Sequence, residues 1–284
     1  MTRLGGAEIT LLRQSILAAR ARLYATSSMP KTTVIIPARW ASTRFPGKPL
    51  FTLLGKPLVQ HVWERSIRAK GIDSVVIATD DMRIAEAAFG FGAEVAMTSP
   101  KCVSGTDRCA EVAARLKNTR QIINVQGDEP MVDPLLISKI AMTLRDDPTL
   151  PMVTAAVPFA EGESTSNPNA VKVVLNRFGN ALYFSRNAIP FLRDTDNFPY
   201  LRHIGIYGYS TKFLLQFVRW PKGKLEGAES LEQLRALENG AIIRVLKARK
   251  ASLGVDTPED ARVAEKLMRG VQPSASRRSK KEDL

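Results

Sequence analysis

Short apolar runs that favour β-strands alternate with helix-like segments in the first half of the chain, and this alternation constrains the fold most strongly. The strand-like runs lie at residues 32–36, 74–78, 93–97 and 122–125, and the helix-like segments at residues 57–70, 82–89, 106–116 and 134–144. Such alternation is typical of a parallel sheet whose strands are joined by helices. The sequence therefore predicts an α/β fold with a Rossmann-like, mainly parallel (mixed) sheet flanked by helices.

The pattern changes at about residue 151, where strand-like runs follow one another with few helices between them. These runs lie at residues 152–157, 171–175, 181–185 and 204–209. We expect them to form a smaller β-rich subdomain over about residues 151–225, within a domain that spans residues 31–270. Helix-like segments return at 225–238 and 258–268, around a strand-like run at 242–246, and we expect this last part to fold back onto the first sheet.

The two ends of the chain differ in composition from the rest. Residues 1–30 carry four arginines and a single acid, Glu8. Two interpretations stay open: an organelle-targeting helix, or an upstream extension for which Met29 is an alternative start. In either case we expect this segment to be dispensable for the fold. Residues 271–284 are rich in serine and charge, which predicts a disordered basic tail.

Composition places the chain among ordinary globular proteins, with 284 residues, 44% hydrophobic and 24% charged. Cys102 and Cys109 are its only cysteines, so we do not expect an extracellular fold held together by disulfides. We expect a reducing, cytoplasmic compartment instead. No apolar run approaches the length of about 20 residues that spans a bilayer, and we expect no membrane partner.

The net charge of +13 raises the possibility of nucleic-acid binding. However, residues 1–31 and 270–284 supply 6 of the 13 charges, and the sequence contains no helix-turn-helix, zinc or base-stacking motif. We therefore expect no nucleic-acid partner, and we interpret the positive charge as attraction for small anionic substrates. The alternative, a basic nucleic-acid-binding protein, predicts binding that survives removal of both ends.

Two strand-like runs are each followed by a charged loop. After the run at 32–36 the chain carries Arg39, Arg44 and Lys48, and after the run at 122–125 it carries Asp128 and Glu129. Loops at the carboxyl ends of parallel strands converge on one crevice, where cations bind phosphate and carboxylates bind Mg²⁺. The sequence thus predicts a metal-polyphosphate site with Asp128 as the first candidate ligand. The alternative is a solvated surface loop and a turn that caps the next helix.

Nucleotide-binding motifs built on backbone groups are missing. Gly47-Lys48 and Gly55-Lys56 are each followed by proline, where a Walker A motif needs a hydroxyl. Phosphate binding must therefore depend on side chains.

Nine ordered blocks between about residues 31 and 268 resemble the 3-deoxy-manno-octulosonate (KDO) cytidylyltransferases, also called CMP-KDO synthetases. The blocks are PARWASTRFPGKPL, TDD at 79–81, SGTDRCAE, NVQGDEP, NPNAVKVV, LYFSR, HIGIYGY, LEQLR and GVDTPED. The resemblance implies the nucleotide-diphospho-sugar transferase type of fold and transfer of CMP from CTP to the anomeric 2-hydroxyl of KDO, with release of pyrophosphate. It also implies a Mg²⁺ requirement, a homodimer, and a place in lipopolysaccharide or cell-wall polysaccharide synthesis.

Residues of the CTP site follow from the same resemblance. Asp128 and Asp256 are implied metal ligands, and together with Arg39 and Lys48 they form the implied catalytic set. The implied CTP contacts are Pro37, Ala38, Arg39, Ser42, Arg44, Lys48, Ser104, Arg108 and Gln126. For Asp256 a structural interpretation competes, because Asp-Thr-Pro-Glu-Asp is typical of a helix start with Thr257 as its cap.

Residues of the sugar site are also implied by the blocks. The implied KDO contacts are Gln126, Arg186, His203, Tyr207, Glu232 and Gln233. Each of the last five has a structural alternative: an ion pair for Arg186, a structural histidine for His203, a strand core for Tyr207, and an exposed helix for Glu232 and Gln233. Another acidic sugar, such as an amino-substituted KDO or a sialic acid, is the alternative substrate.

Overall fold

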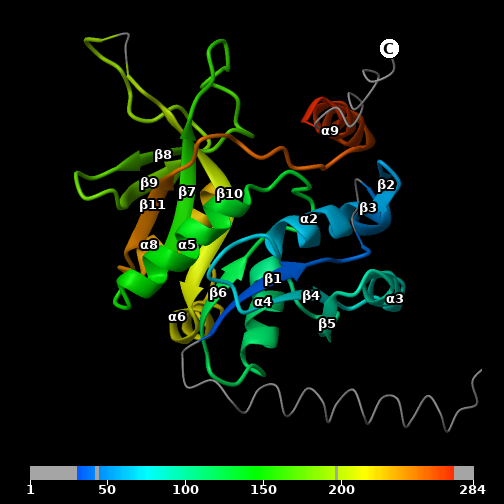
Figure 1. Cartoon of the computed structure of the whole chain (residues 1–284). Coiled ribbons are helices and arrows are strands. Elements are labelled where there is room, and N and C mark those ends of the chain that lie inside the picture. Colours follow the sequence, from blue (N-terminus) through cyan, green and yellow to red (C-terminus); the bar gives the residue numbers. More distant parts are fainter. Residues whose placement is uncertain (1–30, 42–44, 196–197, 272–284) are drawn as a thin grey trace, which may run out of the picture. The chain divides into compact units, whose positions relative to one another are not determined.

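Strand β1 (Lys31–Pro37) lies at the centre of the fold and is buried from Thr32 onward. Its β-branched side chains alternate between the two faces of the sheet, so that Val34 and Ile36 enter one core and Ile35 the other. β1 pairs in parallel with β4 (Ser74–Thr79) and with β6 (Thr119–Asn124). The computed structural model describes residues 31–41, 45–195 and 198–271, which belong to one compact unit (Figure 1).

The main sheet is mixed, with the strand order β11-β7-β10-β6-β1-β4-β5. Beyond β4 lies β5 (Glu94–Met97), and beyond β6 lie β10 (Leu201–Ser210), β7 (Met152–Pro158) and β11 (Ile243–Lys247). Along this path only β10 runs antiparallel to its neighbours. The hairpin of β8 (Lys172–Leu175) and β9 (Ala181–Ser185) joins the sheet through β10, while β2 (Thr52–Leu53) pairs with β3 (Lys56–Pro57) separately.

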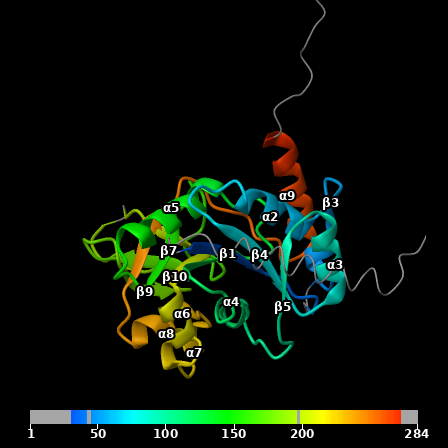
Figure 2. The same cartoon turned by 60° about the horizontal axis from the view of Figure 1, so that its bottom comes forward.

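Helices cover both faces of the sheet (Figure 2). One face carries α2 (Leu58–Ser66), α3 (Met82–Gly90) and α5 (Pro134–Asp146). The other face carries α4 (Gly105–Ala113), α6 (Thr211–Phe217) and α8 (Gln233–Glu238), with α7 (Lys224–Glu229) next to α8. The predicted α/β fold, a mainly parallel (mixed) sheet flanked by helices, is therefore confirmed. None of the described helices is both long and apolar enough to cross a membrane.

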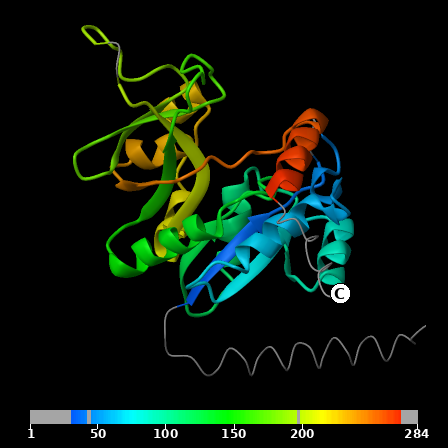
Figure 3. The same ribbon diagram turned by 45° about the horizontal axis from the view of Figure 1, so that its top comes forward.

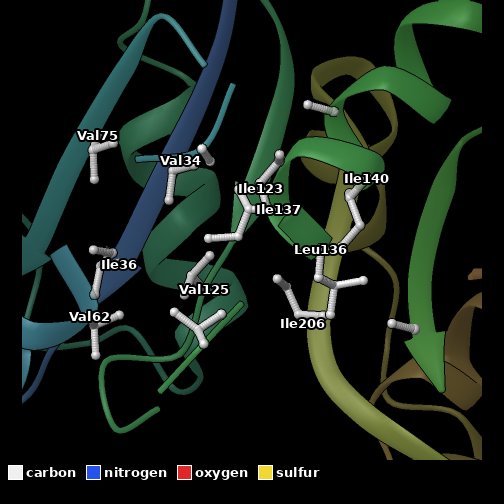
Figure 4. Packing of buried hydrophobic residues seen from close by; sticks show 14 of the residues in the cluster. Val34, Ile36, Val62, Val75, Ile123, Val125, Leu136, Ile137, Ile140 and Ile206 are labelled. Atoms are coloured by element: carbon white, nitrogen blue, oxygen red, sulfur yellow. The ribbon is translucent and has the colours of Figure 1, made fainter. Parts of the chain in front are cut away.

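Each face has its own core. Valine, isoleucine and leucine side chains from β1, β6 and α5 fill the first core, including Val34, Ile123 and Ile137 (Figure 4). The second core is more aromatic, with the rings of Tyr209 and Phe217 6.3 Å apart. Close packing on both faces fixes the positions of the strand ends, where the charged loops begin.

The last part of the chain returns to the sheet, as expected. In Figure 3 the orange segment after β11 crosses from the green and olive strands to the red helix α9 (Pro258–Val271), which lies beside the blue and cyan part of the chain. Ala261 and Ala264 of α9 pack with Leu53 and Leu58 in a third core. This crossing carries Asp256 past the carboxyl end of β6.

Two predicted features differ in detail. The segment at 225–238 is not one helix, because Ser230 adopts a left-handed conformation with φ of 51° and separates α7 from α8. The segment at 151–225 contributes β7 and β10 to the main sheet, while the β8–β9 hairpin extends from it. The strands β7 and β10 therefore extend the first sheet, because the long strand β10 pairs with both β6 and β7.

Candidate active site

A cavity of about 410 Å³ lies at the carboxyl ends of β1 and β6. Four separate stretches of chain and the segment before α9 form its walls. Its lining residues are Pro37, Ala38, Arg39, Lys48, Pro49, Cys102, Val103, Ser104, Gly105, Arg108, Gln126, Gly127, Asp128 and Asp256. Both predicted charged loops therefore face one hollow, as loops at the carboxyl ends of parallel strands do.

The two loops approach each other closely at Gly127. A Cβ atom on Gly127 would lie 2.7 Å from the carbonyl oxygen of Pro37, which is closer than such atoms can pack. The segment before α9 joins the same place, because the N–H of Val255 donates to the carbonyl of Asp128 over 2.9 Å. Backbone contacts thus hold the loop after β1, the loop after β6 and the segment before α9 together.

Lys48 is the centre of charge in the cavity. Its Nζ lies 2.6 Å from Oδ2 of Asp128 and 3.2 Å from Oδ1 of Asp256. Gly47 starts the short 3-10 turn at Lys48–Leu50 in a left-handed conformation with φ of 70°. A side chain there would also approach the Trp40 ring, at 3.0 Å. The structure therefore brings Asp128 and Asp256 to one cation, as the predicted metal site requires of them.

The helix cap at α9 is made by Thr257 and Asp260, and the preceding Asp256 lines the cavity. Thr257 Oγ1 accepts the N–H of Asp260 over 3.2 Å, and Oδ2 of Asp260 accepts the N–H of Thr257 over 2.9 Å. This reciprocal pattern is a capping box. The structural interpretation of the segment is thus correct for Thr257, and it coexists with a cavity-facing Asp256.

The donor set of the cavity fits Mg²⁺ that is shared with a nucleotide. No group of three or more His, Cys, Asp or Glu side chains suited to a metal occurs in residues 31–41, 45–195 and 198–271. Mg²⁺ commonly takes one or two carboxylates and completes its shell with substrate phosphates and water. Asp128 and Asp256 supply such a pair, and Lys48 supplies a cation for the phosphates.

Arg108 forms part of the cavity wall as a buried cation, with 3% of its surface exposed. Its Nη2 donates to Oδ2 of Asp80 over 3.0 Å, and its Nη1 donates to Thr98. Asp80 follows β4 directly, at the same end of the sheet. A carboxylate behind the wall thus fixes the guanidinium that faces the cavity.

Cys102 also lines the cavity, and its thiol is not activated. Burial and the hydrogen bond to Glu111 raise the pKa of Cys102 to about 11. The thiol is therefore protonated at neutral pH, which disfavours a role as a nucleophile.

The first turn of α4 connects the cavity to Glu232. Ser104 caps α4 in a capping box with Asp107. Oε1 of Glu232 lies 3.1 Å from Oγ of Ser104, and Oε2 lies 2.5 Å from Oγ1 of Thr106. Burial raises the pKa of Glu232 in spite of these hydrogen bonds. The predicted sugar contact Glu232 is therefore held beside the predicted cytidine contact Ser104.

Three further predicted sugar residues gather around the end of β6. Gln126 Nε2 donates to Oδ1 of Asn124 over 2.9 Å, and the Tyr207 hydroxyl donates to Oε1 of Gln233 over 3.3 Å. Tyr207 is the register partner of Asn124 across β10 and β6. The buried Nδ2 of Asn124 and Nε2 of Gln233 have no hydrogen-bond partner among the described residues. Two such unpaired donors are suited to the hydroxyl groups of a ligand or to water.

His203 and Arg186 lie in supporting positions. His203 Nε2 is 2.9 Å from Oγ1 of Thr154, and burial lowers the pKa of His203 to about 3, so the imidazole is neutral. Its ring centroid is 5.5 Å from that of Tyr207. The Arg186 guanidinium donates to the carbonyls of Glu229, Pro168 and Ser230. Ser42 and Arg44 lie outside the described residues.

Sequence reasoning missed three polar residues near the cavity. Asp80 follows a parallel strand, which is the signal that could have identified it. Asn124 is a polar residue within a buried apolar strand, and it has no exposed surface. The contact of Thr106 with Glu232 has no signal in the sequence, because the two residues are 126 positions apart.

Comparisons with known proteins agree with this geometry. The family model for cytidylyltransferases matches residues 33–248. A 3-deoxy-manno-octulosonate cytidylyltransferase of Syntrophotalea carbinolica is 50% identical over 248 residues, which cover 84% of this chain and 99% of that protein. An 8-amino-3,8-dideoxy-manno-octulosonate cytidylyltransferase of Shewanella piezotolerans is 46% identical over 236 residues, which cover 82% of this chain and 96% of that protein.

A solved structure shows the same fold. The structure of a CMP:2-keto-3-deoxy-manno-octonic acid synthetase complexed with CTP matches with a TM-score of 0.81 at 41% identity, over 84% of this chain and 99% of that one. The resemblance seen in the nine sequence blocks is confirmed. This chain belongs to the cytidylyltransferase family.

Proposed function

We propose that the protein transfers CMP from CTP to the anomeric 2-hydroxyl of KDO and releases pyrophosphate. The observation that carries this proposal is the meeting of Asp128, Asp256 and Lys48 in one cavity. Relatives named as KDO cytidylyltransferases, with about half of their residues identical to this chain, support the choice of sugar.

Charge neutralisation is the main task of the site. KDO carries a carboxylate and CTP carries a triphosphate, and two like charges about 4 Å apart repel by roughly 4 kcal/mol at an effective dielectric constant near 20. Lys48 and Arg39 line the cavity and offset this repulsion. Because Asp128 and Asp256 hold Lys48 in place before the substrates arrive, Lys48 stabilises the charge that develops in an in-line displacement. Ser42 and Arg44 belong to the same proposed CTP site by sequence.

The remaining cavity residues bind and orient the nucleotide. Arg108 and Ser104 form one wall, and Pro37 and Ala38 form the wall after β1. We assign the cytidine to the space between these walls. Bound Mg²⁺, held by Asp128 and Asp256, would neutralise phosphate charge and lower the pKa of the attacking hydroxyl. Holding the reactants in line supplies much of the rate enhancement.

The sugar belongs on the side of Gln126, Tyr207, Glu232 and Gln233. The unpaired amide donor of Gln233 and the carboxylate of Glu232 suit the hydroxyl groups of KDO. Burial keeps His203 neutral, so it supports the Tyr207 ring and adds no charge to this side. Arg186 remains a predicted sugar contact, although its guanidinium now binds main-chain carbonyls.

The 8-amino analogue of KDO is a second candidate substrate. Relatives that are 46% identical are named 8-amino-3,8-dideoxy-manno-octulosonate cytidylyltransferases. The discriminating experiment is a panel of KDO, its 8-amino analogue and a sialic acid, each incubated with CTP, Mg²⁺ and the full-length protein. Pyrophosphate release should be fastest with KDO. Fast release with another sugar and none with KDO would contradict the substrate assignment.

Three further features complete the proposal. We propose Mg²⁺ as the required metal, which removal by a chelator and re-addition would test. We propose a homodimer, which sedimentation equilibrium would test. We also propose a cytoplasmic enzyme of cell-envelope polysaccharide synthesis, an assignment supported by the two free cysteines, Cys102 and Cys109.

A further inference from the structure

The nucleotide side and the sugar side of the proposed active site meet at the first turn of α4. Thr106, the second residue of this helix, has 4% of its surface exposed, and its Oγ1 lies 2.5 Å from Oε2 of Glu232. Ser104, the residue that caps the helix, contacts the other oxygen of the same carboxylate. One carboxylate therefore joins α4 to the segment that begins α8.

The two hydroxyls that hold Glu232 are not equivalent. Ser104 Oγ lies 3.0 Å from Oδ2 of Asp107 and 3.1 Å from Oε1 of Glu232. A hydroxyl group has one proton to donate, so the donation of Ser104 is divided between two carboxylates. The Thr106 hydroxyl donates a hydrogen bond to Glu232. Although the Thr106 hydroxyl also interacts with the hydroxyl of Tyr209, it makes the shorter of the two hydroxyl contacts to Glu232, 2.5 Å against 3.1 Å for Ser104.

The alternative partner of Glu232 is already engaged. Nη2 of Arg235 is 3.7 Å from Oε1 of Glu232, but the Arg235 guanidinium makes hydrogen bonds of 2.7 and 2.6 Å to Glu226. If the Thr106 hydroxyl were lost, Oε2 of Glu232 would lose its short hydrogen bond, and the carboxylate would be free to turn toward Arg235. The neighbouring Gln233, which accepts from Tyr207, would move with it.

We propose that Thr106 is a positioning residue for the sugar: its hydroxyl fixes the Glu232 carboxylate and, through it, the Glu232–Gln233 wall of the sugar site. This inference rests on the proposed function, which assigns that wall to the sugar. Thr106 itself is too buried to offer surface to a substrate. Its effect is therefore expected in the KM for the sugar and not in the KM for CTP.

The test compares Thr106→Val with Thr106→Ser in the full-length protein. Valine keeps the shape and removes the hydroxyl, whereas serine keeps the hydroxyl. A lost hydrogen bond to a charged group predicts that Thr106→Val raises the KM for KDO by about tenfold or more. The melting temperature should fall in Thr106→Val, because a buried carboxylate loses a hydrogen bond, whereas the KM for CTP should stay at its wild-type value. Thr106→Ser should restore both the KM for KDO and the melting temperature.

Thr211→Val is the matched control. Thr211 begins α6, and its hydroxyl donates to the carbonyl of Thr119 over 2.8 Å, away from the cavity. It should leave both KM values unchanged. In a Glu232→Gln background, Thr106→Val should add little to the KM for KDO. An unchanged KM for KDO in Thr106→Val, an equal rise of both KM values, or a full effect in the Glu232→Gln background would overturn the proposal.

A second measurement does not depend on turnover and separates this proposal from the function. The hydrogen bond from Thr106 lowers the pKa of Glu232. A carbon-13 NMR titration of the Glu232 carboxyl should therefore give a higher pKa in Thr106→Val than in wild type or Thr211→Val. Equal pKa values would refute the positioning contact. A wild-type enzyme inactive with KDO would instead refute the proposed function, and the kinetic comparison would move to the sugar that it uses.

Discussion

The ammonium nitrogen of Lys48 lies 2.6 Å from Oδ2 of Asp128, although the two residues are 80 positions apart in the chain. The same nitrogen reaches Oδ1 of Asp256, which is 208 positions away. Three distant segments therefore place one cation and two carboxylates at a single point. This arrangement matches the needs of a metal-triphosphate substrate, in which charges of both signs must be bound together.

Replacement of Lys48 by methionine should remove the cation that lies between Asp128 and Asp256. We expect kcat/KM for CTP to fall by about a hundredfold, as when one charge-stabilising donor is removed from an active site. Lys56→Met is the matched control, because Lys56 pairs with Glu64 on the surface. Steady-state pyrophosphate release measures both variants. Equal activity of the Lys48 and Lys56 variants would refute the assignment of Lys48.

Replacement of Gly127 by alanine should separate the two charged loops. The new Cβ would meet the Pro37 carbonyl oxygen at 2.7 Å, and backbone cannot move as cheaply as a side chain. We expect a loss of about 1–3 kcal/mol in the free energy of unfolding, with weaker CTP binding. Gly90→Ala adds the same atom where nothing lies within 4 Å. If urea unfolding gave the same free energy of unfolding for both variants, the close approach of Gly127 to Pro37 would not contribute to stability.

Asp80 should matter for nucleotide binding because it fixes Arg108. Asp80→Asn removes the counter-charge of a guanidinium that is almost fully buried. We expect the Kd for CTP, measured by calorimetry, to rise by about tenfold. Asp146→Asn, an exposed carboxylate at the end of α5, serves as the control. A wild-type Kd in Asp80→Asn would show that Arg108 needs no support from Asp80.

His203 should destabilise the protein in acid. Its pKa is about 3 in the folded state, against an ordinary value of 6.5, so below pH 6.5 the unfolded chain binds a proton that the folded chain refuses. The free energy of unfolding therefore falls as the pH falls from 6.5 toward 3, by up to about 1.4 kcal/mol per pH unit from this group.

His203→Gln should remove this contribution while keeping a hydrogen bond to Thr154. Between pH 6.5 and 5, wild type should lose about 2 kcal/mol more than the variant in urea unfolding. Burial and Asp128 raise the pKa of Glu129 to about 7, which acts in the opposite direction over this range, but it does so in both proteins. Parallel losses in the two proteins would mean that His203 takes up a proton in the folded state.

The sequence predicts the frame of this fold because its signals are local. β1 and β6 can be predicted from their β-branched, apolar runs. The convergence of the charged loops that follow them can be predicted from the rule that the carboxyl ends of parallel strands meet at one edge of the sheet. The break between α7 and α8 cannot be predicted from the sequence, because the left-handed conformation of Ser230 depends on tertiary contacts. One of them is the hydrogen bond from Arg186 to the carbonyl oxygen of Ser230. Local propensity favours a continuous helix there, and tertiary structure overrides it.

The candidate site was predictable to a similar degree. Asp128 and Lys48 follow strands whose ends must converge, so their meeting could be expected. The contact between Thr106 and Glu232 could not, because it depends on how α4 and α8 pack on one face of the sheet. The guanidinium of Arg186 likewise binds three carbonyls that only the folded chain brings together.

The most direct test of the central claim is manganese binding followed by electron paramagnetic resonance, with Mn²⁺ as the probe for Mg²⁺. In the presence of CTP, wild type should bind Mn²⁺ tightly, and Asp128→Asn and Asp256→Asn should each weaken the same signal. Retention of wild-type, CTP-dependent Mn²⁺ binding by either variant would contradict a metal site shared by the two aspartates.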